Sequence, residues 1–184
     1  QDGLYFITIC TQNRACLFGE IADGEMILND AGKMVENEWG NLKNRFPNIE
    51  LHEFIVMPNH FHGILQIVGA TLVVAQNNNM VVQNDDGATN NRATTRVAPT
   101  RVAPTAVGDI VGAFQSIVTV NYIRAVKNFG WQSFDKKLWQ RNYWEHIIRN
   151  EKSYTNIVNY IINNPAKWEM DTLYNNQLNQ RYRP

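Results

Sequence analysis

The 184-residue chain has few cysteines, no long apolar run and no net charge. Its two cysteines, Cys10 and Cys16, are too few for a disulfide framework, and no further cysteine or nearby histidine completes a zinc set. It lacks the run of about 18 uncharged apolar residues that a membrane-spanning helix needs, and it lacks the basic-then-apolar start of a signal peptide. We therefore expect a soluble, cytoplasmic protein with reduced thiols and no membrane partner.

The zero net charge is the sum of unequal parts. Residues 1–69 carry 4 basic and 9 acidic residues, whereas residues 107–184 carry 10 basic and 6 acidic residues. Binding of a polyanion needs local positive potential rather than a positive total. The C-terminal part is therefore the candidate phosphate-facing region, although an excess of this size also occurs on ordinary solvated helix faces.

One domain over residues 1–184 is expected, because the length and the 44% apolar content allow one substantial core. Residues 70–106 differ in composition from the rest of this domain. They are rich in Asn, Thr and Ala, and they contain the sequence TRVAP twice in succession, at 95–99 and 100–104. Two copies are too short for a solenoid, so this segment is interpreted as a flexible surface insertion within the domain.

β-branched and aromatic residues fill positions 4–10, and an apolar segment at 16–19 follows the polar residues 11–14. This pattern predicts a hairpin of two strands. Two further apolar runs, 51–57 and 62–68, flank a proline and an asparagine. They indicate two adjoining strands, or one strand interrupted near the proline, which cannot donate to a central ladder.

Three helices are predicted from apolar spacing and from residues that cap or stop helices. The first is capped by Asn29 or Asp30 and extends to about residue 45. The second starts with Asp109 in the N-cap position and ends at Gly130, and the third extends from about 150 to 163, before Pro165. Strands followed by helices in this order predict an α+β fold with helices packed on an antiparallel sheet.

Two of the four histidines, His60 and His62, lie two positions apart in a predicted strand. Alternate side chains of a strand point to the same face, so both imidazoles project together while Phe61 points the other way. Divalent ions bind imidazole nitrogen readily and can act as Lewis acids on a phosphodiester. The alternative is a pair of surface or hydrogen-bonded histidines, since histidine serves in many settings.

A covalent mechanism on DNA requires a nucleophile, and tyrosine can provide one. In the last predicted helix, Tyr160 lies just outside the apolar arc, and Asn164 follows one turn later on the same face. Tyr154 lies within that arc and is expected in the core. Tyr122 is the main competitor, but one turn after it stands Val126, which cannot bind a metal. A half-buried tyrosine at a helix–sheet seam and an asparagine that ends a helix are the structural alternatives.

Three segments together resemble the REP-associated tyrosine transposases, relatives of the single-strand transposases of small bacterial insertion sequences. The segments are residues 54–65 (FIVMPNHFHGIL), 138–150 (LWQRNYWEHIIRN) and 160–165 (YIINNP). Apart from the insertion, the resemblance extends from the first predicted strand to about Trp168. It implies a ferredoxin-like or RRM-like α+β fold, with an HUH motif of two histidines around a bulky apolar residue on a central strand.

The resemblance also implies a site and a reaction. His60, His62 and Asn164 would bind Mg²⁺ or Mn²⁺, and Tyr160 would attack a DNA phosphodiester, leaving a 5′-phosphotyrosyl link and a free 3′-OH. Family members act on repetitive extragenic palindromes, which form imperfect hairpins beside a short single-stranded tetranucleotide. The implied partner is single-stranded or hairpin DNA in the nucleoid, bound by a monomer or a homodimer.

Four residues of the second segment combine aromatic faces with a guanidinium group and are candidate DNA contacts: Trp139, Arg141, Tyr143 and Trp144. Aromatic residues at such spacing also occur in cores. Two other functions remain open for the chain. One is a non-catalytic nucleic-acid-binding protein of the same fold, and the other is a metal-dependent phosphodiesterase that uses water instead of tyrosine.

Overall fold

A four-stranded antiparallel sheet is the centre of this computed structural model, which describes residues 3–68 and 106–174. Its strands, in spatial order, are β4 (Ile49–Met57), β5 (His60–Ile67), β1 (Gly3–Cys10) and β6 (Trp144–Ile148). Helix α1 (Asp30–Arg45) follows β1 along the chain, and α2 (Val107–Phe129) follows β5. Apart from a small hairpin before α1, two short 3₁₀ helices and a third helix after β6, the chain order is β-α-β-β-α-β, the ferredoxin-like arrangement. The predicted α+β fold is confirmed.

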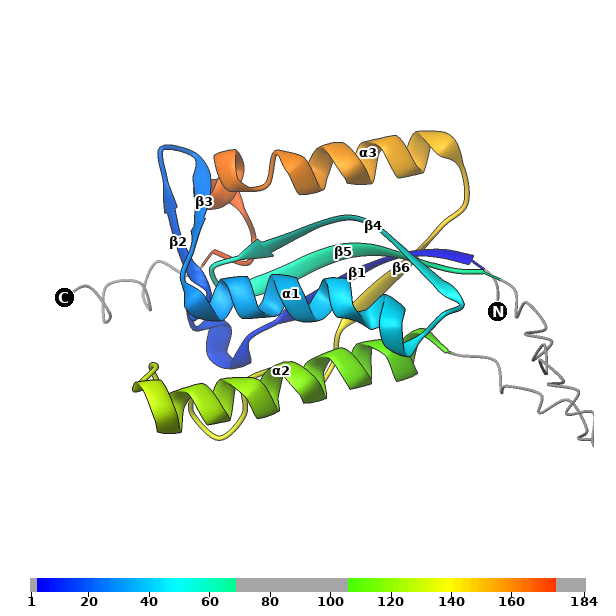
Figure 1. The fold of residues 1–184 in the computed structure, drawn as a ribbon. Helices are drawn as coiled ribbons and strands as arrows, with labels where there is room; N and C mark the ends of the chain where they lie inside the picture. Colours follow the sequence, from blue (N-terminus) through cyan, green and yellow to red (C-terminus); the bar gives the residue numbers. More distant parts are fainter. Residues whose placement is uncertain (1–2, 69–105, 175–184) are drawn as a thin grey trace, which may run out of the picture.

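Helices cover both faces of the sheet (Figure 1). Helices α1 and α2 lie on one face, and α3 (Glu151–Ile162) lies on the other. Strand β1 supplies side chains to both layers, because alternate residues of a strand point to opposite faces. Ile7 and Ile9 join the main core with α1 and α2, whereas Phe6 joins a smaller apolar cluster with α3. Strand β5, which carries the histidine pair, is buried along almost its whole length.

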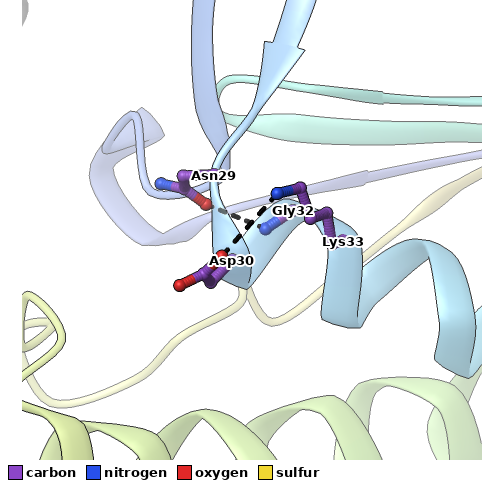
Figure 2. A network of polar contacts seen from close by, with 4 residues as sticks. All are labelled: Asn29, Asp30, Gly32 and Lys33. Carbon is purple, nitrogen blue, oxygen red and sulfur yellow. Dashed lines mark hydrogen bonds and ion pairs between the residues drawn. The ribbon is translucent and has the colours of Figure 1, made fainter.

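The start of α1 has the cap that its sequence predicts (Figure 2). The side chain of Asn29 accepts a hydrogen bond from the backbone N–H of Gly32 at 2.9 Å. An exposed ion pair between Asp30 and Lys33, 3.8 Å apart, adds little in water. Large apolar side chains at three- and four-residue spacing are buried on one face of the helix: Val35, Trp39 and Leu42.

The predicted hairpin between residues 4–10 and 16–19 is wrong. Strand β1 pairs with β5 and β6 instead. The backbone N–H groups of Leu17 and Phe18 donate to the carbonyl oxygen of Pro58, and both side chains are buried, so this apolar segment is a core-filling loop. The chain then forms a separate hairpin of β2 (Gly19–Ala22) and β3 (Glu25–Leu28).

Other boundaries differ in detail from the prediction. The runs around Pro58 are two adjoining strands, with Met57 opposite His60 across a two-residue turn. Asp109 is not the N-cap of α2. It lies in the first turn, where its Oδ2 accepts from the backbone N–H of Ala106 at 3.1 Å. Gly130, with φ of +69°, ends α2 as predicted. Strand β6 is absent from the predicted elements.

The predicted insertion at 70–106 lies, except for its last residue, outside the described residues. Within residues 3–68 and 106–174, no helix combines the length and apolar character needed to span a membrane.

Candidate active site

The histidine pair lies on the face of β5 that α3 covers. His60 and His62 are buried, and their ring centroids are 4.4 Å apart. Phe61 points to the opposite face, where its ring packs 4.7 Å from that of Trp39. The alternation of the strand therefore separates a polar pair from the main apolar core, as the sequence predicts.

Each imidazole is held through its Nδ1 atom. His60 Nδ1 lies 2.8 Å from Asn59 Oδ1, and His62 Nδ1 lies 2.8 Å from Thr8 Oγ1. The amide nitrogen of Asn59 donates to two carbonyl oxygens, those of Arg14 and Leu173, which fixes the oxygen toward His60. An amide oxygen only accepts, so His60 carries its proton on Nδ1 and its Nε2 has a free lone pair.

Burial keeps both imidazoles neutral. It lowers the pKa of His60 from 6.5 to about 3, with the positive charge of Arg14 as the second cause. The pKa of His62 also lies well below 6.5, because of burial first and of His60 second, against an opposing effect of Asp171. Neutral imidazole is the form that coordinates a metal ion. At neutral pH the pair is therefore ready to bind one without losing protons.

Tyr160 brings its hydroxyl to this pair from the end of α3. Its Oη lies 3.3 Å from His62 Nε2, and the two ring centroids are 5.2 Å apart. The residue is 44% exposed and lines an open hollow, so a large molecule can approach its side chain. Burial raises the pKa of Tyr160, and the negative charge of Asp171 raises it further. The phenol is therefore protonated at neutral pH when no cation lies beside it.

Asn164 stays on the same side as Tyr160, although α3 ends at Ile162. Its backbone is helical, with φ of −60° and ψ of −43°, because it leads into the 3₁₀ helix η2 (Pro165–Met170). The carboxamide is buried. Its Nδ2 donates to Asp171 Oδ2 at 3.1 Å, whereas Oδ1 finds no hydrogen-bond partner among the described residues. An unpaired buried carbonyl costs about 1–3 kcal/mol, and this oxygen is free to accept a cation.

The structure separates the competing tyrosines from this site. Tyr122 is buried in the main core, where its hydroxyl donates to the carbonyl oxygen of Gln132 at 2.9 Å, and burial raises its pKa to about 12. Tyr154, in the first turn of α3, packs against the smaller apolar cluster, with its hydroxyl 3.3 Å from His52 Nδ1. Of these three tyrosines, only Tyr160 directs its hydroxyl at the histidine pair.

The four candidate DNA contacts are placed differently from one another. Trp139 is buried among Phe18 and Phe114, and its Nε1 donates to a backbone carbonyl, so it offers no free face for a base. Tyr143 is half-buried and donates to Glu145. The other two are exposed: Arg141 and Trp144.

Known proteins resemble the chain in sequence and in fold. No family model matches it. An uncharacterised protein of Haemophilus influenzae is 44% identical over 174 residues, which are 95% of this chain and 86% of that protein. A REP-associated tyrosine transposase of Escherichia coli is 53% identical over 32 residues, 17% of this chain and 19% of that protein.

A solved structure of a REP-associated tyrosine transposase bound to a REP hairpin has a TM-score of 0.52 to this structure. The match covers 90% of this chain and 68% of that chain, at 20% identity. The chain belongs to one family with the Haemophilus protein and has the REP-associated tyrosine transposase fold. The resemblance that the three sequence segments indicated is confirmed.

Within this transposase fold, the described residues bring a third metal-binding side chain to the histidine pair. One ligand atom from each of His60, His62 and Asp171 lies within 4.8 Å of the others. Next to this group are two buried atoms without a hydrogen-bond partner among the described residues, His60 Nε2 and Asn164 Oδ1. Imidazole nitrogens with carboxylate and carboxamide oxygens suit a divalent cation, so the group can bind a metal ion.

Sequence reasoning missed Asp171. It follows η2 in a turn, where its Oδ1 accepts from the backbone N–H of Leu173 at 2.7 Å. No motif spacing links it to the histidines, and it lies beyond the end of the family resemblance. The only sequence signal was an acidic residue shortly after Asn164.

Proposed function

We propose that the chain is a metal-dependent single-stranded DNA endonuclease and transposase that cleaves through a covalent bond to Tyr160. One observation carries this proposal: the hydroxyl of the partly exposed Tyr160 lies 3.3 Å from the Nε2 atom of a buried, neutral histidine. The orphaned His60 Nε2 and Asn164 Oδ1 provide ligand atoms beside it. These two atoms lie in one place beside the nucleophile, which favours a shared ligand.

The metal would be held by His60, His62 and Asn164, with Asp171 close enough to add a carboxylate. Mg²⁺ and Mn²⁺ are the candidates, and Mn²⁺ accepts imidazole more readily than Mg²⁺ does. When bound, such an ion supplies Lewis-acid stabilisation of charge on the phosphate oxygens. Asn59 and Thr8 would keep both histidines oriented, as hydrogen-bonded partners of metal ligands do.

The proposed reaction is a displacement at phosphorus. The Oη atom of Tyr160 forms a bond to the phosphorus, and the bond from phosphorus to the 3′-oxygen breaks. The products are a 5′-phosphotyrosyl link and a free 3′-OH, and the proton lost by the phenol is balanced by the proton gained by the 3′-oxygen. Because the phosphate ester is preserved, the reverse reaction can join the fragment to another 3′-OH.

The proposed substrate is a hairpin with a single-stranded flank. Support comes from the fold, since a transposase of this fold has been solved with a REP hairpin, and from the exposed Trp144, which lines the same hollow as Tyr160. Arg141 is exposed as well. A guanidinium group can bind phosphate, and an indole can stack on an unpaired base.

A denaturing gel tests the proposal. The protein is incubated with labelled hairpin DNA and Mn²⁺, and the wild type should form a covalent complex that Tyr160→Phe abolishes. Tyr154→Phe is the matched control, because it removes a hydroxyl from the same helix that bonds to His52 instead. An adduct that persists in Tyr160→Phe would show that the nucleophile is another residue. Cleavage without an adduct would favour water as the nucleophile, and hairpin binding without cleavage would favour a binding module.

A further inference from the structure

A hollow of about 550 Å³ opens between β6 and α3, beside the proposed nucleophile. Its walls include Phe6, Trp144 and His146 from the sheet and Lys152, Asn156 and Tyr160 from the helix. The volume falls within the range of roughly 300–1,000 Å³ that is usual for sites that hold small organic groups. We call it the β6–α3 hollow.

Exposed aromatic rings form one wall of the hollow. Trp144 and His146 are alternate residues of β6, so their rings project from the same face, 5.8 Å apart and inclined by only 5°. Trp144 is 54% exposed, although its edge-on contact with Phe6, at 5.6 Å, anchors it to the buried cluster. A flat aromatic surface held in place but open to the hollow is suited to stacking on another planar ring.

The helix wall carries polar groups that are free to bind. Among the described residues, Lys152 forms no ion pair and the side chain of Asn156 forms no hydrogen bond. An ammonium group beside a planar binding surface suits a phosphate, and a carboxamide can both donate to and accept from a base edge. The hollow therefore combines a stacking surface, a cation and a hydrogen-bonding group, which is the chemistry of a nucleotide.

The hollow adjoins the proposed reaction site. Tyr160 lines it and also contacts His62, and Phe6 lies against both Tyr160 and Trp144, with ring centroids 6.1 and 5.6 Å away. Building on the proposed function, we propose that the β6–α3 hollow binds one unpaired nucleobase of a nucleotide flanking the cleaved phosphate, stacked on Trp144. A paired base already stacks within its duplex and presents only its groove edges, so the hollow selects single-stranded DNA.

Binding without cleavage tests this subsite. Fluorescence anisotropy in EDTA compares a short oligothymidylate with an abasic strand of the same length, which keeps every phosphate and lacks every base. Trp144→Leu should weaken oligothymidylate binding roughly 5- to 100-fold, because leucine still covers Phe6 but cannot stack, and should leave the abasic strand nearly unchanged. Trp144→Phe should retain most of the affinity. Lys152→Ala should weaken both strands alike.

Phe129→Ala is the control, since Phe129 is a highly exposed aromatic residue at the end of α2, on the other face of the sheet. It should leave both affinities unchanged. If Trp144→Leu binds both strands as the wild type does, or weakens both equally, there is no base subsite in the hollow. The proposed function would still hold if the wild type forms the covalent adduct through Tyr160. If the wild type binds neither strand and forms no adduct, both proposals are overturned.

Discussion

The hydroxyl of Tyr160 lies 3.3 Å from Nε2 of His62, although 98 residues separate the two along the chain. Strand β5 supplies the histidine and the end of α3 supplies the tyrosine, so the packing of this helix on the sheet creates the contact. A cation on Nε2 would replace the hydroxyl as the partner of that atom. Since Tyr160 is 44% exposed, its side chain has room to make way and remain beside the ion.

Metal binding should stabilise the protein. At a free Mn²⁺ concentration about 100 times the dissociation constant, the gain in unfolding free energy is about 3 kcal/mol, or roughly 5–10 °C in melting temperature. Differential scanning fluorimetry with and without Mn²⁺ measures the shift. His62→Ala should abolish it, while His146→Ala, which removes an exposed histidine outside the metal group, should retain it. An equal shift in both variants would place the ion elsewhere.

Acid should destabilise the metal-free protein through the buried histidines. The folded pKa is about 3 for His60 and well below 6.5 for His62, whereas both are 6.5 in the unfolded chain. Above pH 6.5 the two states bind equal numbers of protons at these groups. As the pH falls below 6.5, the unfolded chain gains these protons first, so the unfolding free energy drops by about 1 kcal/mol per pH unit for each histidine, down to about pH 3 for His60.

Urea denaturation in EDTA, repeated across this pH range, measures the slope. The variant with both His60→Gln and His62→Gln has the same carboxylates and should show a shallower fall between pH 6.5 and 5. Identical slopes in the two proteins would mean that the imidazoles take up protons in the folded state.

Thr8→Val removes the hydroxyl that holds His62 Nδ1 at 2.8 Å while keeping the shape of the side chain. A buried imidazole nitrogen without a partner costs about 1–3 kcal/mol. Loss of the hydrogen bond that orients a metal-binding histidine typically weakens metal binding roughly 10- to 100-fold. Isothermal titration with Mn²⁺ gives the affinity. Thr119→Val, which deletes a hydroxyl bonded to the Gln115 carbonyl in α2, should lose stability without losing metal affinity.

Local signals predicted much of this fold because they act over a few residues. Asn29 caps α1, Gly130 ends α2 and Pro165 follows α3, each through its own backbone or side-chain chemistry. The pairing of β1 with β5 and β6 depends on long-range contacts that no local pattern encodes. Strand β6 escaped detection because it is an edge strand with four exposed residues, and its sequence WEHII lacks the alternation of a half-buried strand.

The sequence predicted those site residues that follow the spacing of a strand or a helix, and it missed the one that does not. His60 and His62 follow the two-residue period of a strand, and Tyr160 and Asn164 follow the four-residue spacing of a helix turn. The structure brings these four side chains together. Asp171 has no such relation, since a turn after η2 returns the chain to the site.

Asp171 should support the metal site in two ways. Its carboxylate lies among the ligand atoms of His60 and His62, and its Oδ2 accepts from Asn164 Nδ2 at 3.1 Å, which leaves Asn164 Oδ1 free for a cation. Asp171→Asn removes the charge and lets the Asn164 amide rotate, so the Mn²⁺ affinity measured by isothermal titration should fall roughly 10- to 100-fold. Glu169→Gln makes the same charge change at an exposed position of η2 and should leave the affinity unaltered. An equal loss of Mn²⁺ affinity in both variants would mean that general negative charge, rather than the position of Asp171, attracts the ion. If Asp171→Asn keeps the full affinity, then His60, His62 and Asn164 are a sufficient ligand set.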